Sequence, residues 1–490
     1  MEKLRAGLDA LIAMTKKVNS PIDSRVTGKF LLINIPLFHE EAALPPLGLA
    51  YIAALLEEEG YNVDLFDANV LGLDRKAIVS YVRQVKPRFI GLSVMYSSFE
   101  FACTLTKDIK QLPFRTEIIW GGPHPSICPE ASIVDGGADI CVMGEGERTI
   151  LELAELLHEG PEAWNDISGL CFRSGDEIKY TAPRELITDL DSIPYPAHHL
   201  LAMDRYRTLH TGKKQFCTII TSRGCPGRCM FCSRCIFGRR MRYRSIDNVI
   251  GEIELLLKIY QVEEIAILDN AFLEDRDRII ELCRRIREKG LKFNWRLGNG
   301  VRVDQVDEEL LTIMKDAGCF DLAFGVESGD DEVLRKIGKN ITTDHTRRAF
   351  RIAQKVGLTT IGFFQLGHPF DTIETMEKTI DLAIEIDPTY VQFAISTPLP
   401  GTALWNWVKH HGKEIADMKS IKIDIFGGNP YFGTENFTKE DVSRMYRRAY
   451  RRFYYRPSYI IKKLRLIHSW NDIFILIKGL FYLRCTQKNS

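Results

Sequence analysis

The sequence has no net charge and no apolar run long enough to cross a membrane. Its 65 lysines and arginines are balanced by 65 aspartates and glutamates over 490 residues, so overall charge predicts neither a nucleic-acid partner nor an acidic substrate. The first 29 residues are polar and lack a long apolar core, which predicts neither a signal peptide nor a membrane span. Low-complexity segments and short tandem repeats are also absent, and the 45% hydrophobic content is that of a globular protein.

The cysteines lack the regular pairing of a secreted disulfide framework. Without a secretory leader, the twelve cysteines indicate a reducing cytoplasm, in which clustered thiols hold metals or take part in catalysis. Eight are scattered singly and are expected to be buried bystanders: Cys103, Cys128, Cys141, Cys171, Cys217, Cys283, Cys319 and Cys485. The other four lie between residues 225 and 235, and this crowding predicts a functional site.

The segment from residue 30 to about 157 alternates short apolar runs with amphipathic stretches. Short apolar strands separated by helices are typical of a parallel sheet covered on both faces, so we expect a flavodoxin-like Rossmann domain of the α/β class. Ligands of such domains bind at the carboxyl ends of the strands. The strands are predicted at 30–36, 62–68, 88–94, 117–122 and 139–144.

A second alternating region follows a connector, which contains a predicted hairpin turning at Ser174-Gly175. This region repeats a strand and a helix about six times, which predicts a partial (β/α)6 barrel with its chemistry at the C-terminal ends of the strands. Its strands are predicted at 217–222, 264–270, 293–298, 321–327, 359–367 and 389–397. The predicted divisions are an N-terminal extension (1–29), a first domain (30–157), the connector (158–215), the barrel (216–410) and a C-terminal helical region (411–490).

Three of the clustered cysteines have a spacing that suits an iron–sulfur cluster. Cys225, Cys229 and Cys232 form a C-x3-C-x2-C pattern directly after the first strand of the barrel, and Cys235 follows. A structural zinc site usually takes its ligands from two separated knuckles, and the sequence has no second knuckle. An all-cysteine, ferredoxin-like site is another alternative. Three thiolates at a barrel mouth would leave one iron of a 4Fe–4S cluster open, as catalysis at a metal requires.

The stretch TSRGCPGRCMFC resembles the signature of the radical S-adenosylmethionine (SAM) superfamily, C-x3-C-x-aromatic-C. The resemblance implies that the three cysteines hold a 4Fe–4S cluster, that SAM binds its open iron, and that Phe231 contacts the adenine. The segment DLAFGVESGDDEVLRKIGK resembles the fourth-strand element of this family, which implies that Glu327 and Ser328 approach SAM. FFQLGHPFDT resembles its G-x-P loop, here Gly367 to Pro369, and is equally compatible with a structural turn.

The first domain resembles the cobalamin-binding domains that are fused to such barrels. Small residues after the third and fourth strands let a large cofactor approach the backbone. SVMYSS, GGPHPS and MGEGERT resemble the elements around the nucleotide tail of cobalamin. The resemblance implies contacts from Ser93, Gly121, Gly122, Gly144, Glu145 and Gly146. The D-x-H-x-x-G motif of many cobalamin domains is missing, and His39 stands in the right loop without that motif, so the lower cobalt ligand stays open.

The C-terminal region is basic and aromatic. Eleven lysines and arginines but only one acidic residue, Asp472, lie between Arg444 and Arg484. Aromatic residues are interleaved with them, namely Tyr446, Tyr450, Phe453, Tyr454, Tyr455 and Tyr459. The apolar run 473–483 is too short to span a bilayer. One interpretation is that these helices pack on the barrel with their arginines solvated. The other is peripheral contact with an anionic membrane, which would favour a lipid-like substrate.

Together these features predict a cytoplasmic, cobalamin-dependent radical SAM methyltransferase that methylates an unactivated carbon. The resemblance implies cobalamin, SAM and a 4Fe–4S cluster as cofactors, a small-molecule or lipid-like substrate, a reductant such as ferredoxin or flavodoxin, and no nucleic acid. The chain is also similar to the anaerobic magnesium-protoporphyrin ester cyclase and hopanoid methylase type, so a non-methylating reaction with the same cofactors is an alternative. A non-catalytic cobalamin-binding protein is a third, against which the intact cysteine motif argues.

Overall fold

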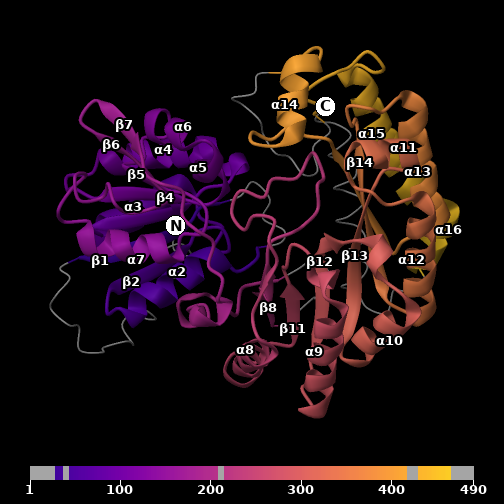
Figure 1. Ribbon diagram of the computed structural model, residues 1–490, viewed down its shortest axis with the longest axis horizontal. Helices are drawn as coiled ribbons and strands as arrows, with labels where there is room; N and C mark the ends of the chain where they lie inside the picture. Colours follow the sequence, from indigo (N-terminus) through magenta and orange to yellow (C-terminus); the bar gives the residue numbers. More distant parts are fainter. Residues whose placement is uncertain (1–27, 37–42, 208–214, 417–428, 465–490) are drawn as a thin grey trace. The chain divides into compact units, whose positions relative to one another are not determined.

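The computed structural model describes residues 28–36, 43–207, 215–416 and 429–464, which divide into two compact units (Figure 1). Among these residues, the first unit contains the strand at residues 29–34, Pro45–Glu185 and Ser192–Arg205. The second unit contains Leu186–Asp191 and the chain from Tyr206 onward. Within the described ranges, no helix is both long and apolar enough to cross a membrane.

The first unit is built on a seven-stranded sheet in the order β2-β1-β3-β4-β5-β6-β7. Strands β1 to β5 are parallel, and helices cover both faces: α3 and α4 contribute to one hydrophobic cluster, and α2 and α7 to the other. The strands are β1 (Lys29–Asn34), β2 (Asn62–Asp67), β3 (Phe89–Ser93), β4 (Glu117–Gly121), β5 (Ile140–Val142), β6 (Leu170–Ser174) and β7 (Glu177–Tyr180). The helices are α2 (Leu47–Glu58), α3 (Arg75–Val85), α4 (Phe99–Lys110), α5 (Pro123–Ile127), α6 (Pro129–Val134) and α7 (Glu147–Leu156). The strand order 2-1-3-4-5 confirms the predicted flavodoxin-like fold.

The hairpin of the predicted connector belongs to the sheet of the first unit. β6 pairs antiparallel with β5, and β7 pairs antiparallel with β6 across the turn that begins at Gly175 (φ +61°). Leu170, Cys171 and Phe172 of β6 are completely buried, Cys171 in one hydrophobic cluster and the other two in the second. The sheet of the first unit therefore continues past residue 157, where the sequence alone predicted the domain to end.

The second unit contains six parallel strands in the order β15-β14-β13-β12-β11-β8, with helices between them, which confirms the predicted partial barrel (Figure 1). The strands are β8 (Phe216–Ile219), β11 (Glu264–Ile267), β12 (Asn294–Val301), β13 (Cys319–Glu327), β14 (Thr359–Leu366) and β15 (Tyr390–Ile395), and a separate short pair is formed by β9 (Ser222–Arg223) and β10 (Arg242–Tyr243). The helices are α8 (Ile246–Ile259), α9 (Arg276–Glu288), α10 (Glu308–Asp316), α11 (Asp331–Lys336), α12 (Thr343–Val356), α13 (Ile373–Ile386) and α14 (Ala403–His411). Since all six strands are parallel, the loops after them gather at one end of the barrel.

Two tyrosines of the C-terminal region close one edge of the barrel sheet. α15 (Lys439–Tyr454) packs against α13 and against the edge strand β15, and α16 (Pro457–Leu464) follows it. The Tyr454 hydroxyl accepts from Val391 N (3.1 Å) and donates to Val391 O (2.7 Å), and the Tyr450 hydroxyl does the same at Phe393 (3.2 and 3.1 Å). The hydroxyls therefore occupy the backbone groups that an edge strand would otherwise leave free.

Two arginines of α15 form ion pairs with the barrel. Arg448 and Arg452 both bind Glu377 on α13, and Arg456 binds Asp387 at 2.9 Å. The packing of these helices on the barrel is confirmed. The expected solvation of the arginines holds for Arg451, which is exposed, whereas Arg448 and Arg452 pair with acidic residues of α13. The apolar run 473–483 lies outside the described residues.

Replacing Tyr450 and Tyr454 with phenylalanine should destabilise the second unit. Each change leaves one N–H and one C=O of β15 without a partner, at a cost of about 1–3 kcal/mol per tyrosine. The measurement is the free energy of unfolding in urea. Tyr455→Phe is the control, because the Tyr455 side chain is 41% exposed and its loss should change little. Equal effects of the control and the two tested variants would contradict the edge-closing role.

Candidate active site

The cysteine loop follows β8 at the C-terminal end of the barrel. Because β9 and β10 pair antiparallel, the chain between them closes into a loop that contains all four clustered cysteines. Cys225 N donates to Gly238 O (3.3 Å), and Met230 N donates to Ile337 O (2.9 Å). These bonds tie the loop both to its own base and to the end of α11, so the cysteines have a fixed backbone.

Two of the motif thiols border the same glycine of the loop. A Cβ added to Gly227 would lie 3.3 Å from Cys225 Sγ and 4.0 Å from Cys229 Sγ, so both sulfurs border this glycine. Among the described residues, no three His, Cys, Asp or Glu side chains are grouped so as to hold one metal ion. A 4Fe–4S cluster takes one thiolate on each of its separate irons. Burial raises the pKa of the Cys232 thiol to about 11, and coordination would remove that proton.

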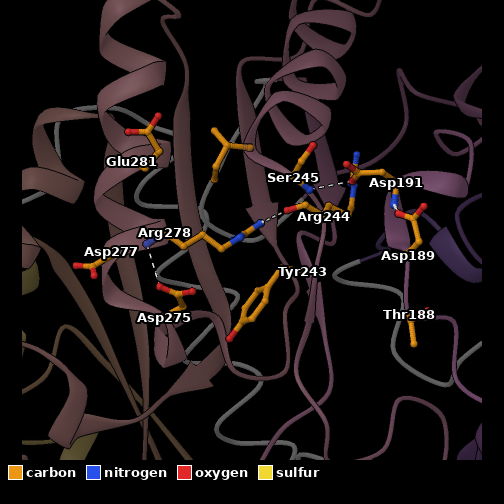
Figure 2. A pocket seen from close by; sticks show the side chains of 11 residues that line it. Thr188, Asp189, Asp191, Tyr243, Arg244, Ser245, Asp275, Asp277, Arg278 and Glu281 are labelled. Carbon is orange, nitrogen blue, oxygen red and sulfur yellow. Dashed lines mark hydrogen bonds between the residues drawn. The ribbon is translucent and has the colours of Figure 1, made fainter.

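A buried carboxylate fixes the chain that leads into the loop. Asp269, after β11, accepts hydrogen bonds of 2.6 Å each from Thr221 N, Thr221 Oγ1 and Ser222 Oγ. From the outer side, Arg278 donates to Thr221 O (3.1 Å) and Arg244 O (3.0 Å), as the close-up of the neighbouring surface pocket shows for Arg244 (Figure 2). The first strand of the barrel and the base of the cysteine loop are therefore held as one rigid part.

A buried ion pair lies beside the cysteines. Glu327 ends β13 after an irregularity in its pairing with β14, and it has a left-handed backbone (φ +70°) that costs a non-glycine residue about 1–3 kcal/mol. Its carboxylate binds Lys339 Nζ and Gln365 Nε2, both at 2.9 Å. Burial raises the pKa of the Cys229 thiol. The charge of Lys339 lowers this pKa and the charge of Glu327 raises it, so both charges act on this cysteine. Strain and buried charge at one point mark a functional site.

The Ser328 hydroxyl has different hydrogen-bond partners from the Glu327 carboxylate. Its side chain is completely buried, and its hydroxyl lies 3.4 Å from Thr379 Oγ1 on α13 and accepts from Asp330 N at 3.2 Å. The structure therefore brings Glu327 to the cysteine loop and gives Ser328 contacts behind the end of β13. The predicted approach of Ser328 to SAM stays a prediction.

The aromatic residue of the cysteine motif meets the G-x-P loop. The rings of Phe231 and His368 have centroids 5.7 Å apart. His368 is completely buried, its Nδ1 lies 3.2 Å from Ser396 Oγ, and its Nε2 has no hydrogen-bond partner among the described residues. Burial, together with Lys339, lowers the pKa of His368 to about 3, so the ring is neutral. An unsatisfied buried nitrogen beside Phe231 is a polar group that a bound nucleoside could use.

The small residues predicted for the first unit meet at the C-terminal edge of its sheet. Ser93 and Gly121 are paired in register at the ends of β3 and β4. Gly122 (φ +98°) is confined, because a Cβ there would lie 3.2–3.4 Å from Val94 and from Ser93 Oγ. Gly144 (φ +74°), after β5, donates its N–H to Ser126 Oγ at 2.9 Å, which links it to α5, the short helix after β4. Glu145 is buried, Gly146 caps α7, and His39 lies outside the described residues.

The histidine of GGPHPS is a residue of this edge that the sequence analysis missed. His124 is 5% exposed and stacks on Phe99 with ring centroids 4.1 Å apart. The Ser132 hydroxyl donates to Cys128 O (3.0 Å), so in its 2.9 Å contact with His124 Nδ1 it accepts, and the proton is on Nδ1. His124 Nε2 therefore carries a lone pair. A histidine two residues after the Gly121-Gly122 pair at a strand end was the signal that could have found it.

His124 should make the first unit sensitive to acid. Burial lowers its pKa to about 4 from 6.5, so the unfolded chain binds a proton in a pH range in which the folded chain does not. The contribution of neutral His124 to stability is present above pH 6.5 and is lost as the pH falls towards 4. When the pH is lowered from about 7.5 to about 5, the free energy of unfolding in urea should fall by about 2 kcal/mol more for the wild type than for His124→Gln. Parallel losses would show that His124 is charged in the fold.

Two family models match the chain. The B12 binding domain matches residues 38–154, and the Radical SAM superfamily matches residues 219–383. An uncharacterised methyltransferase of Pyrococcus horikoshii is 35% identical over 87% of this chain and 91% of its own length. The chain belongs to the cobalamin-binding radical SAM enzymes. The predicted family and enzyme class are thereby confirmed, and cobalamin and SAM are the cofactors that the two family descriptions name.

Other members of the cobalamin-binding radical SAM enzymes are more distant. The cytidylyl-2-hydroxyethylphosphonate methyltransferase of Streptomyces wedmorensis is 29% identical over 80% of this chain and 83% of its own. The anaerobic magnesium-protoporphyrin IX monomethyl ester cyclase of Rubrivivax gelatinosus is 27% identical over 81% and 70%. The solved radical SAM methyltransferase TsrM of Kitasatospora setae, with cobalamin and a 4Fe–4S cluster bound, is 22% identical over 77% and 74%, with a TM-score of 0.64. That likeness confirms the fold.

The structure adds three residues to the predicted site of this enzyme. Lys339 and Gln365 bind Glu327, and Asp269 fixes the base of the cysteine loop. Lys339 belongs to the quoted segment that ends in IGK, and Asp269 ends the apolar run EIAILDN. A charged residue directly after a buried strand, or after a glycine turn, was the signal that could have identified Lys339 and Asp269.

Proposed function

We propose that the protein methylates an unactivated carbon of a small-molecule substrate, with a 4Fe–4S cluster, SAM and cobalamin as cofactors. When bound, the cluster and SAM supply a carbon-centred radical, and cobalamin supplies a transferable methyl group. The observation that carries the proposal is the cysteine loop: three motif thiols on a braced backbone, with a buried ion pair beside Cys229. Relatives named as methyltransferases at 35% and 29% identity favour methyl transfer.

The side chains of the second unit have separate tasks in this proposal. Cys225, Cys229 and Cys232 would hold three irons and leave the fourth for the amino and carboxylate groups of SAM. The Lys339 ammonium offers a partner for that carboxylate, and Glu327 one for the amino group. Phe231 provides an apolar face for the adenine, and the buried pocket wall around His368 excludes water. Each of these tasks is binding, orientation or exclusion of solvent.

The first unit would hold cobalamin at the C-terminal edge of its sheet. Ser93, Gly121 and Gly122 present small side chains at adjacent strand ends, and Gly144 to Gly146 border the next strand. A position at the carboxyl ends of β3, β4 and β5 is where this fold binds its ligands. A Gly122→Val variant would place methyl groups against Val94 and Ser93 and should prevent cobalamin binding, which equilibrium dialysis can measure.

Product analysis with labelled SAM tests the proposed reaction. The reconstituted protein is incubated under reducing, anaerobic conditions with SAM that carries a deuterated methyl group and with metabolites from a strain lacking the gene. We expect equal amounts of 5′-deoxyadenosine and S-adenosylhomocysteine and a product heavier by one labelled methyl group. A product without label that has lost hydrogen or gained oxygen would overturn methylation. It would favour the second candidate, an oxidative ring closure, to which the 27% identity with the cyclase points.

A lipid-like substrate and contact with a membrane surface depend on the segment after residue 464. In the described part of the C-terminal region, Arg448, Arg452, Arg456 and Lys462 bind acidic residues of the barrel and are not left for lipid headgroups. We therefore favour a water-soluble small molecule as the substrate. If the full chain sediments with anionic vesicles and does not sediment with neutral vesicles, this preference would be reversed.

A further inference from the structure

The cysteine loop carries an uneven charge that cluster binding does not explain. Between Thr221 and Ile246 the sequence contains no aspartate or glutamate. The same stretch contains seven arginines: Arg223, Arg228, Arg234, Arg239, Arg240, Arg242 and Arg244. In a chain with equal numbers of acidic and basic residues, this is a strong local excess of positive charge.

Four of the seven arginines serve the loop itself. Arg242 donates to Ile187 O (2.7 Å), and Arg244 binds Glu252 at 2.5 Å. Arg223 lies over the ring of Phe237, and Arg234 donates to Gly227 O at 2.8 Å. Three of these four, Arg223, Arg242 and Arg244, are buried, so their charges are not offered to a partner.

The other three arginines are exposed on the two arms that enclose the cysteines. Arg228, Arg239 and Arg240 are exposed, and none of them forms an ion pair with a residue that the structure describes. Arg228 lies between Cys225 and Cys229 in the sequence, and its carbonyl faces Gly338, where an added Cβ would lie 2.6 Å away. The Arg240 carbonyl is so close to Gly224 that no Cβ would fit there. Three exposed guanidinium groups are therefore carried by the same loop as the sulfur ligands.

The neighbouring surface has the opposite charge. A surface pocket of about 730 Å³ beside β10 and the first turns of α8 and α9 is lined by five carboxylates: Asp189, Asp191, Asp275, Asp277 and Glu281. Its two arginines, Arg244 and Arg278, donate to backbone carbonyls at the base of the cysteine loop, and Figure 2 shows the bond from Arg278 to Arg244 O. An acidic protein would be repelled from this pocket and attracted to the exposed arginines of the loop.

We infer that Arg228, Arg239 and Arg240 form the docking surface for a small acidic one-electron carrier of the flavodoxin type. The inference rests on the proposed function, in which the cluster must be reduced by one electron before each cleavage of SAM. Electron transfer requires the donor to approach the cluster closely, and the cysteine loop is the surface nearest to it. One electron leaves the flavin hydroquinone anion, which becomes the neutral semiquinone, and enters the cluster, so that no bond or proton at the protein changes. Such encounters are brief and depend on charge.

A binding measurement tests this surface without turnover. Oxidised flavodoxin is titrated into the holoenzyme at low and high salt, and the affinity is followed by calorimetry or by flavin fluorescence. In R228E/R239E/R240E the Kd at low salt should rise by about ten-fold or more, and its dependence on salt should nearly disappear. The matched control is R348E/R351E/R451E, which removes three arginines that are exposed on α12 and α15, and should bind as the wild type does. Unchanged affinity in the loop variant would overturn the inference.

The rate of 5′-deoxyadenosine formation separates docking from other roles of these arginines. With reduced flavodoxin as donor, the loop variant should be slowed by about ten-fold or more at low salt, whereas reduced methyl viologen, a small cation, should support the wild-type rate. A loss with both donors would overturn the inference, because the arginines would then act on the cluster or on a substrate. R239E/R240E keeps the residues between the cysteines and should show the same pattern if R228E/R239E/R240E fails to hold iron. Wild-type protein that is inactive with both donors would refute the proposed function instead.

Discussion

The Cys229→Ala variant, purified and reconstituted without oxygen, should contain almost no iron or sulfide and should form no 5′-deoxyadenosine. In a cubane cluster each thiolate holds a different iron, so the remaining two cysteines cannot replace the lost ligand from their own positions. Cys229 is at the centre of the site, because its thiol interacts with Cys225, with Lys339 and with Glu327. Its removal is therefore expected to abolish the cluster rather than weaken it.

Cys235→Ala is the matched control for this loss. Cys235 is in the same loop, three residues after Cys232, and burial raises the pKa of its thiol. It has no counterpart in the family motif, so its alanine variant should keep the iron, the sulfide and the electron paramagnetic resonance signal of the reduced cluster. That signal should change when SAM is added to Cys235→Ala and to the wild type. Equal loss of iron in both variants would show that four cysteines ligate the cluster and that no iron is open for SAM.

The strands and the cysteine site could be predicted because their signals are local. Apolar runs such as Phe30 to Ile33, completely or almost completely buried in β1, mark central strands wherever they occur. The spacing of Cys225, Cys229 and Cys232 lies within eight residues and needs no knowledge of the fold. Gly60 could be predicted to end a helix for the same reason, and it follows α2 with φ +81°.

The remaining features depend on contacts between distant parts of the chain. The hairpin β6-β7 was visible in the sequence, but its pairing with β5 was not. A hairpin that extends a neighbouring sheet and a hairpin that stands alone have the same sequence pattern. The basic residues of α15 suggested solvated arginines, and only the position of Glu377 on α13 shows that Arg448 and Arg452 are paired. Lys339 is twelve residues from Glu327, and a turn after α11 brings the two together. Such partners are chosen by the fold and not by a local pattern.

Lys339→Met should lower the free energy of unfolding of the cofactor-free protein by about 3–5 kcal/mol. The substitution keeps most of the side-chain volume and removes the ammonium group, so Glu327 is left as a buried carboxylate with Gln365 as its remaining hydrogen-bond partner. Both side chains of the pair are 8% exposed, so water cannot replace the lost charge. The measurement is unfolding in urea, and the exposed pair of Arg335 and Glu332 supplies the control, because Arg335→Met should leave the stability essentially unchanged.

The double variant Lys339→Met/Glu327→Gln separates stability from function. It removes both charges together, so most of the lost stability should return, since no unpaired charge stays buried. SAM binding should not return, because neither the ammonium for the SAM carboxylate nor the carboxylate for its amino group is present. If the double variant binds SAM as tightly as the wild type does, the ion pair only supports the strained end of β13. If stability returns and SAM binding does not, the pair is retained for recognition of the charged end of SAM, and the strain at Glu327 serves to hold that carboxylate beside Cys229.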